Sequence, residues 1–128
     1  MELQAVSNAL IESQEGFSVE QMGDCLAITN EVGIVSHLAV VGSQITVETL
    51  LFPAEQVKDV NELNSHILAT HKLVPLTAVS TTEVEGNLYY SAFGALSSES
   101  KVESVVIEVV TLFSNTVELL DAYSDFLK

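Results

Sequence analysis

The sequence predicts an α+β domain, residues 1–128, in which N-terminal, middle and long C-terminal helices pack against an antiparallel sheet of five to six strands. Helical and strand patterns occur in separate blocks, in the order α-ββββ-α-ββ-α, and such blocks typically give an antiparallel sheet with the helices on one face. Residues 97–128 contain no Gly and no Pro, and their apolar positions repeat with a helical period. With 48% hydrophobic residues, the chain is long and apolar enough to form one core.

The first block is a helix followed by four strands. Apolar residues from Leu3 to Leu10 repeat at helical spacing, and Gly16 is expected to end this helix as a C-terminal cap. The strands are predicted at residues 17–22, 25–29, 34–41 and 44–52. Gly42 with Ser43 is a two-residue hairpin signal, because the first position of such a turn needs a positive φ. We therefore expect an antiparallel meander.

The second block is a helix followed by two strands. Pro53 ends the meander, and Asp59 with Glu62 has the spacing of a capping box that opens a helix ending near Lys72. Pro75 prevents any continuation of this helix. The two strands are predicted at residues 76–84 and 88–93, joined by a hairpin at residues 85–87.

The C-terminal helix is predicted within residues 97–128, with Ser100 and Glu103 as its capping box. Its apolar residues cover an arc of about 200°, which is wider than the stripe of a helix that packs on one core. Two covers are therefore expected, the sheet on one side and the N-terminal helix or a second subunit on the other. A buried strand over Val105–Phe113 is the alternative, because β-branched residues are frequent there.

The charge of the chain is strongly one-signed, with 18 acidic residues, 4 Lys and Arg together, and a formal net charge of -14. Phosphate groups are bound by basic side chains, so nucleic acid is excluded as a direct ligand and anionic lipid is disfavoured. A basic segment of another protein is the partner that this charge would attract. Alternatively, the charge only keeps a hydrophobic domain in solution.

Several features predict a cytoplasmic protein. Cys25 is the only cysteine, which excludes an internal disulfide, and its apolar neighbours indicate a buried small hydrophobe. The N-terminus has no basic segment followed by an apolar one, so no signal peptide is predicted. No apolar run approaches the ~18 residues of a membrane span, and direct membrane insertion is not expected.

Three histidines raise the hypothesis of a metal site. His66 and His71 are five residues apart, which places them about 140° apart on a helix and prevents a shared metal on one helix face. His37 lies in a predicted strand, so a site would require all three to converge beside a carboxylate. Glycine-rich phosphate loops and G-x-S-x-G elbows do not occur in the sequence. We predict no catalytic residue, no metal and no cofactor.

Several segments resemble a known family. They are Val57–Asp59, Leu73–Leu76 and above all Tyr89–Ser97, followed by Glu108, Leu112, Asn115, Leu119, Leu120, Ala122 and Tyr123. Together they resemble the YjfI-like family, small bacterial proteins of unknown function, and the resemblance covers nearly the whole chain. It implies no catalytic residues, but it implies a setting beside relatives of phage-shock protein A, which coat stressed membranes.

The block order is also similar to that of type III secretion chaperones. These are acidic, usually dimeric proteins that bind segments of other proteins, and the similarity is one of fold. The wide apolar arc of the C-terminal helix predicts a homodimer, and the net charge predicts a basic segment as partner. The resemblance implies that this segment belongs to a phage-shock-protein-A-like protein.

The sequence thus favours a non-enzymatic protein-binding module, an adaptor or chaperone linked to an envelope-stress system. The expected contact residues lie on the outer arc of the C-terminal helix and on the last strand: Ile107, Val110, Leu119, Phe126, Tyr89 and Tyr90. The alternative is a small-molecule or metal-binding sensor, or a small enzyme, that uses His37, His66 or His71. A purely structural subunit of a larger assembly is the third reading.

Overall fold

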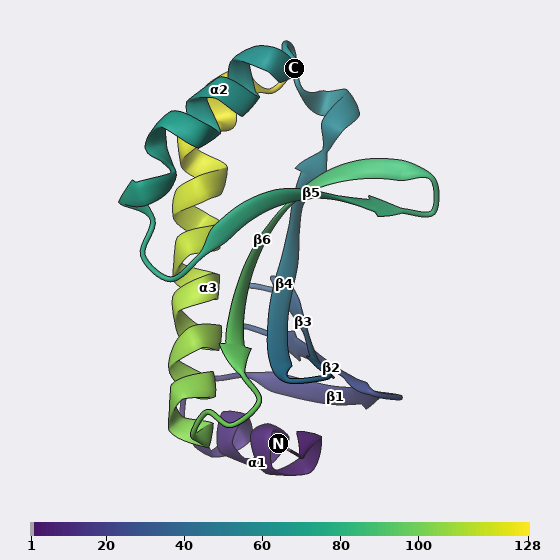
Figure 1. The fold of residues 1–128 in the computed structure, drawn as a ribbon, viewed down its shortest axis with the longest axis vertical. Helices are drawn as coiled ribbons and strands as arrows, with labels where there is room; N and C mark the ends of the chain where they lie inside the picture. Colours follow the sequence, from purple (N-terminus) through teal and green to yellow (C-terminus); the bar gives the residue numbers. More distant parts are fainter. Residues whose placement is uncertain (1) are drawn as a thin grey trace.

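The computed structural model describes residues 2–128 and shows three α-helices packed on a six-stranded sheet (Figure 1). The helices are α1 (Leu3–Glu12), α2 (Val60–Thr70) and α3 (Val102–Ala122). The strands are β1 (Ser18–Met22), β2 (Cys25–Thr29), β3 (Val35–Val41), β4 (Gln44–Pro53), β5 (Ala78–Val84) and β6 (Asn87–Ser97). Short 3-10 turns follow β4, α2 and α3: η1 (Ala54–Gln56), η2 (His71–Leu73) and η3 (Ser124–Phe126). The predicted α+β class and element order are confirmed.

All neighbouring strands pair antiparallel, and their order in the sheet is β1-β2-β3-β4-β6-β5. The first four strands form the expected meander. The later hairpin joins it with β6 beside β4, which leaves β5 at the edge of the sheet. Because α2 and η2 lie between β4 and β5 in the chain, the connection brings them to this same edge.

The helices lie on one face of the sheet, and no helix within residues 2–128 covers the other face (Figure 1). α3 runs along the length of the molecule, α1 packs against its N-terminal half, and α2 lies near its C-terminal end. Between α3 and the sheet is the core, whose fully buried members include Leu38, Val47, Val105 and Val109. α1 and α2 thus each cover one end of the long helix.

The ends of α1 and α2 test two capping predictions. The expected cap at Gly16 is wrong, because Gln14 takes a left-handed conformation at φ 64° and α1 already ends at Glu12. At α2 the Asp59 half of the predicted capping box is confirmed, since the Asp59 side chain accepts a hydrogen bond from the Glu62 N–H at 3.2 Å, and the helix ends at Thr70.

The start of α3 differs from the prediction. Lys101 is the N-cap and provides no side-chain hydrogen bond, so Ser100 and Glu103 form no capping box. The preceding turn is closed by the Ser100 N–H, which donates to the Ser97 carbonyl at 3.0 Å. Val105–Phe113 lies wholly inside α3, so the alternative of a strand there is wrong. No helix in the described part of the chain is long and apolar enough to cross a bilayer.

Two strand details also differ. β6 continues beyond its predicted end, because Gly94 pairs with Val47 on β4 instead of leaving the sheet. Cys25 is half-buried rather than buried, because Leu26 and Ile28 are the residues of β2 that face the core.

Candidate functional site

α2 and the segment after it carry apolar side chains that the core does not use. Leu63 and Ile67 of α2 are buried in the core. In contrast, Leu68 of α2 and Leu73 of η2 are each 79% exposed, and Leu76 before β5 is 63% exposed. Leu68, Leu73 and Leu76 are called the apolar α2 surface below.

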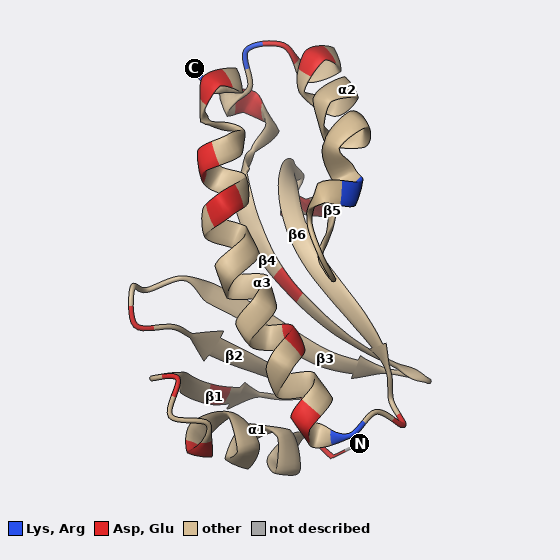
Figure 2. Ribbon diagram, turned by 90° about the vertical axis from the view of Figure 1, so that its left-hand side faces the viewer, with Lys and Arg blue, Asp and Glu red and all other residues tan. Residues whose placement is uncertain are grey.

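The apolar α2 surface lies in a part of the chain without acidic residues. No Asp or Glu occurs from Leu63 to Thr82, although the whole chain has 18. Figure 2 shows many of the acidic residues along α3 and in the loops at the ends of the strands. Exposed apolar side chains with few charges among them are typical of protein contact surfaces.

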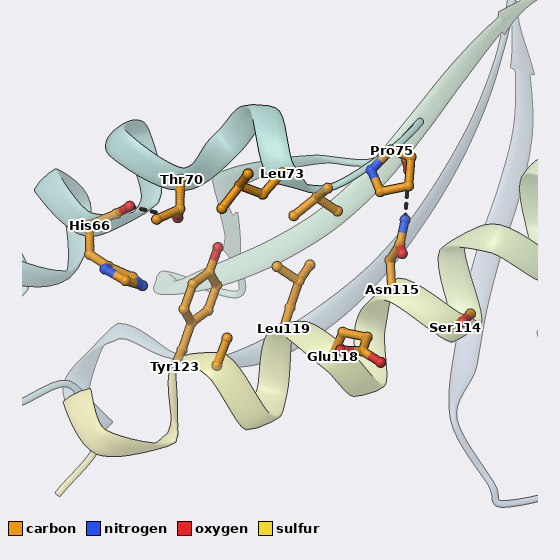
Figure 3. A pocket seen from close by; sticks show the side chains of 11 residues that line it. His66, Thr70, Leu73, Pro75, Ser114, Asn115, Glu118, Leu119 and Tyr123 are labelled. Atoms are coloured by element: carbon orange, nitrogen blue, oxygen red, sulfur yellow. Dashed lines mark hydrogen bonds between the residues drawn. The ribbon is translucent and has the colours of Figure 1, made fainter.

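Asn115 of α3 holds the segment that exposes Leu76. Its Nδ2 atom donates to the Pro75 carbonyl at 2.7 Å and to the Thr77 hydroxyl at 2.8 Å (Figure 3 shows the first of these). Leu76 lies between these anchors with a φ of 65°, a left-handed conformation. That conformation costs roughly 1–2 kcal/mol for a residue other than Gly. The two hydrogen bonds therefore fix a strained residue whose apolar side chain is exposed.

A groove opens between η2 and the end of α2 on one side and the C-terminal half of α3 on the other (Figure 3). Its volume is about 510 Å³, within the range of roughly 300–1,000 Å³ of ligand pockets. Leu73, Val74 and Leu119 give it apolar walls, and Ser114 and Glu118 add polar groups on α3. This is called the α2–α3 groove below.

Aromatic rings close one end of the groove. His66 of α2 lies edge-to-face with Tyr123 at a centroid distance of 6.0 Å, and its ring is 4.9 Å from that of Phe126. Tyr123 is buried, and this burial raises the pKa of its hydroxyl. Tyr123 therefore stays neutral at ordinary pH and acts as a wall of the groove.

A smaller hollow of about 280 Å³ lies on the other side of α2, against β5 and β6. Leu68, Ile67 and Val79 line it together with Tyr90, whose hydroxyl donates to the Asn64 side chain. Burial raises the pKa of Tyr90. This is called the β5 hollow, and the exposed Leu68 forms part of its wall together with polar side chains of Asn64, Ser80 and Thr81.

The predicted contact residues differ widely in exposure. Ile107 is 58% exposed on α3. Three others are half-buried: Val110, Phe126 and Tyr89. Leu119 and Tyr90 are 3% and 2% exposed, so both belong to the core and are reached only through the hollows that they line.

The apolar α2 surface was not predicted from the sequence. Leu68 comes directly after the buried Ile67 of α2, so it lies off the buried side of the helix. Leu73 and Leu76 lie on either side of Pro75, outside the long helices and strands, so no periodic pattern identifies them. The available signal was the absence of Asp and Glu from Leu63 to Thr82.

The three histidines do not converge. His37 is exposed on β3 opposite Glu48 of β4, away from the other two. His71 Nε2 accepts a hydrogen bond from the Val79 N–H at 3.0 Å, which ties η2 to β5 and requires an unprotonated Nε2. Within residues 2–128, no group of three or more His, Cys, Asp or Glu side chains is placed to hold a metal ion.

One carboxylate is buried away from the groove. Glu108 of α3 is 6% exposed and packs over Gly94 of β6, where a Cβ would overlap the Glu108 carboxylate. Burial raises the pKa of the Glu108 carboxyl, with no hydrogen bond or cation acting in the other direction. Glu108 lines neither the α2–α3 groove nor the β5 hollow.

The chain matches known sequences over most of its length. The family model of an uncharacterized protein conserved in bacteria, DUF2170, matches residues 1–127. The uncharacterized protein YjfI of Escherichia coli K12 is 30% identical over 83 residues, which cover 65% of this chain and 62% of YjfI. The same values hold for YjfI of Escherichia coli O157:H7. The match thus spans less than two thirds of the length of these relatives.

Several solved structures share the fold. YbjN from E. coli has a TM-score of 0.76 at 14% identity, with 99% of this chain and 95% of that chain covered. A chain of the HopA1-SchA chaperone–effector complex has a TM-score of 0.59 at 13% identity, with 90% and 96% covered. A chain of the ExsC-ExsE complex has a TM-score of 0.56 at 10% identity, with 94% and 96% covered. The predicted likeness to chaperones is confirmed as a likeness of fold.

Proposed function

The chain belongs to the DUF2170 family of bacterial proteins, as its resemblance to YjfI implied, and from this premise we propose a non-enzymatic protein-binding module of the adaptor or chaperone kind. The apolar α2 surface carries the proposal. Its three leucines are exposed by 63–79%, and burying one such side chain in an interface contributes roughly 1.5–3 kcal/mol. Exposed apolar groups gathered in one short segment favour association with another protein.

The fold likeness supports the same class of function. One of the solved structures that share the fold is a complex of a chaperone with an effector protein. In the present chain the helices leave one face of the sheet uncovered within residues 2–128, and α2 is flanked by two hollows. Surfaces of suitable size for another chain are therefore available without rearrangement of the core.

A second copy of the chain is the first occupant that we propose. Two-fold symmetry brings the same patch of both subunits together, so Leu68 of each copy would enter the β5 hollow of the other. Repulsion between two chains of net charge -14 is weakest where the facing surfaces carry no Asp or Glu, as between Leu63 and Thr82. The outer arc of α3 at Ile107 and Val110 is the alternative interface.

The second occupant is proposed to be a basic segment of another protein in the cytoplasm. The net charge of -14 attracts such a segment and repels nucleic acid and anionic lipid. A phage-shock-protein-A-like protein of an envelope-stress system is the partner that the family resemblance suggests, and it stays part of the proposal.

Light scattering of the purified protein tests the proposed self-association. The wild type is expected to have the mass of a dimer at micromolar concentration, and Leu68→Glu the mass of a monomer, because a buried unpaired carboxylate is strongly unfavourable. Ile107→Glu is the matched control, since Ile107 is also a largely exposed apolar residue on a helix, and it should remain dimeric.

Circular dichroism would verify that both variants keep the fold. Dissociation by Ile107→Glu but not by Leu68→Glu would place the interface on the outer arc of α3. A wild-type monomer would rule out the homodimer.

A further inference from the structure

We propose that the α2–α3 groove binds a basic segment of a partner protein, in which a Lys or Arg meets Glu118 and a large apolar side chain packs beside Leu73. This inference rests on the proposed function, because it specifies where the module binds its partner and which chemistry the segment carries. Three properties of the groove support it: its charge, its apolar wall and its fixed shape.

The C-terminal end of α3 and the turn after it carry three acidic residues, of which Glu118 lines the groove. Glu118 and Asp121 lie near the end of α3, Asp125 follows in η3, and all three are exposed. No basic residue occupies the last turn of α3. The carbonyl groups at a helix C-terminus add partial negative charge, so cations are favoured there and further anions are not. A cation supplied from outside the chain would offset both contributions.

No Lys is among the described residues that line the groove, although the exposed Lys72 of η2 directly precedes Leu73 in the chain. Lys58 Nζ donates to the Asp125 carbonyl at 3.3 Å, beyond the end of the groove. Among the described residues that line the groove, Glu118 is the one with a full charge, and no Lys is present. Figure 2 shows the acidic residues that follow this part of α3. The groove therefore selects against anionic ligands and in favour of Lys or Arg.

The apolar wall supplies the second requirement. Leu73 is 79% exposed, and it lines the groove with Val74, Leu119 and Ala122. An apolar side chain placed there would remove both itself and Leu73 from water. Pro75 lines the groove, and the exposed Leu76 follows it in the chain. Because this apolar surface continues past the groove, a chain segment fits it better than a small amine.

The shape of the groove is fixed before any ligand arrives. Asn115 holds Pro75 and Thr77 with hydrogen bonds of 2.7 and 2.8 Å, and these residues belong to the segment that forms the wall opposite α3. Asn115 is therefore a positioning residue for the groove. A segment that binds a preformed groove loses less free energy to ordering than one that must organise its site.

The test uses short fluorescein-labelled peptides and the full chain. Each peptide carries one Phe and one Arg within one helical turn on an Ala and Gln background, in all spacings and both orders. Matched sets replace Arg by Glu or Phe by Ser. Fluorescence anisotropy at low salt is expected to show binding by Arg–Phe peptides, about tenfold weaker binding by the Glu set, and loss of binding on addition of salt.

Variants of the protein locate the site. Glu118→Gln should weaken binding of the Arg–Phe peptides about threefold, the size expected for an exposed ion pair, and Leu73→Ser about tenfold, as for a buried contact residue. Glu83→Gln is the control, because Glu83 is an exposed acid of β5 that lines neither the groove nor the β5 hollow, and binding should not change.

Three results of the peptide-binding measurements would overturn the inference. They are the absence of binding by every Arg–Phe peptide, equal binding by the Glu set, and binding that Glu118→Gln and Leu73→Ser leave unchanged. A solution mass that falls to a monomer in Leu73→Ser would also overturn it, since the groove would then belong to the homodimer. If no peptide binds the groove but the protein forms a dimer that Leu68→Glu dissociates, the proposed function stands without this inference. If the protein also forms no such dimer, the proposed function is rejected as well.

Discussion

Each half of α3 buries a polar side chain that faces other elements, Glu108 in one half and Asn115 in the other, whereas the buried Thr116 hydroxyl donates to the Leu112 carbonyl within the helix. Glu108 and Asn115 are seven residues apart in α3, so two turns separate them and they lie on the same side of the helix. Asn115 is 8% exposed and donates two hydrogen bonds to the segment around Leu76. Glu108 is 6% exposed, and burial alone raises the pKa of its carboxyl.

The difference shows which half of the helix is shaped for binding. In the N-terminal half, α1 and the sheet cover the helix, and the buried carboxylate of Glu108 is tolerated because Gly94 leaves room for it. In the C-terminal half, the polar group of Asn115 fixes the wall of a groove that stays open. A buried polar side chain that organises a segment beside a groove is part of the site, whereas a carboxylate whose charged form is disfavoured by burial lowers stability at neutral pH.

The largest effect is expected at Gly94, in the covered half. A Cβ at this position would overlap the Glu108 carboxylate, so Gly94→Val should lower the free energy of unfolding by about 2–3 kcal/mol. Urea unfolding followed by circular dichroism measures this loss. Ala95→Val is the matched control, because Ala95 is the exposed neighbour on β6, and its effect should stay within about 0.5 kcal/mol.

A double variant tests whether Glu108 is the reason. Glu108→Ala in the Gly94→Val background removes the overlapped side chain, so part of the lost stability should return. If Gly94→Val costs the same with and without Glu108, the glycine is required for a different reason, and the two residues are not a matched pair.

The next largest effect is expected from Asn115→Ala, in the open half. The substitution leaves the Pro75 carbonyl and the buried Thr77 hydroxyl without their donor, which should lower the free energy of unfolding by about 2 kcal/mol. Urea unfolding measures the change. Ser114→Ala is the control, since Ser114 lines the groove but is exposed.

Asn115→Ala should also weaken binding of Arg–Phe peptides to the groove, even under conditions where the variant is fully folded. Glu83→Gln, which changes a residue outside the groove, should leave that binding unchanged. A loss of stability without any loss of peptide binding would mean that Asn115 serves the core alone, and the contrast with Glu108 would then be one of hydrogen bonding only.

The fold class, the order of elements and the Asp59 cap followed from the sequence because each depends on residues close together in the chain. The errors at Gly16 and Ser100 also have local causes. Gln14 already has the left-handed conformation after α1, and the Ser97 carbonyl accepts the hydrogen bond of the Ser100 N–H in the turn before α3. Such competition between adjacent turn formers leaves no periodic signal.

The site could not be predicted in the same way. Asn115 looks like any polar residue on a helix until tertiary folding brings Pro75 and Thr77 to it. Apolar periodicity placed Val105, Val109 and Leu112 of α3 correctly on the buried side. It also placed the exposed Val117 there and counted the buried Leu119 as a contact residue, because a wide apolar arc does not show where burial ends. The exposure of the leucines around Pro75 can be recognised only when the structure shows which apolar residues form the core.

The smallest expected effect is the pH dependence of the stability difference between Glu108→Gln and the wild type. It measures the contribution of the negative charge of Glu108 separately from its packing. Burial raises the pKa of the Glu108 carboxyl above its ordinary value of 4.5, so the native state binds this proton more tightly than the unfolded state does. Wild-type stability should therefore fall as the pH rises through the raised pKa, and this cost is absent below pH 4.5, where both states are protonated.

Gln keeps the shape of the side chain without its charge, so Glu108→Gln should be more stable than the wild type at neutral pH. Thermal unfolding across this pH range should show the advantage shrinking as the pH falls. Glu118→Gln, which changes an exposed carboxylate on the same helix, should show no such trend. An advantage that is constant with pH would mean that packing over Gly94, and not the buried charge, distinguishes this half of α3 from the half held by Asn115.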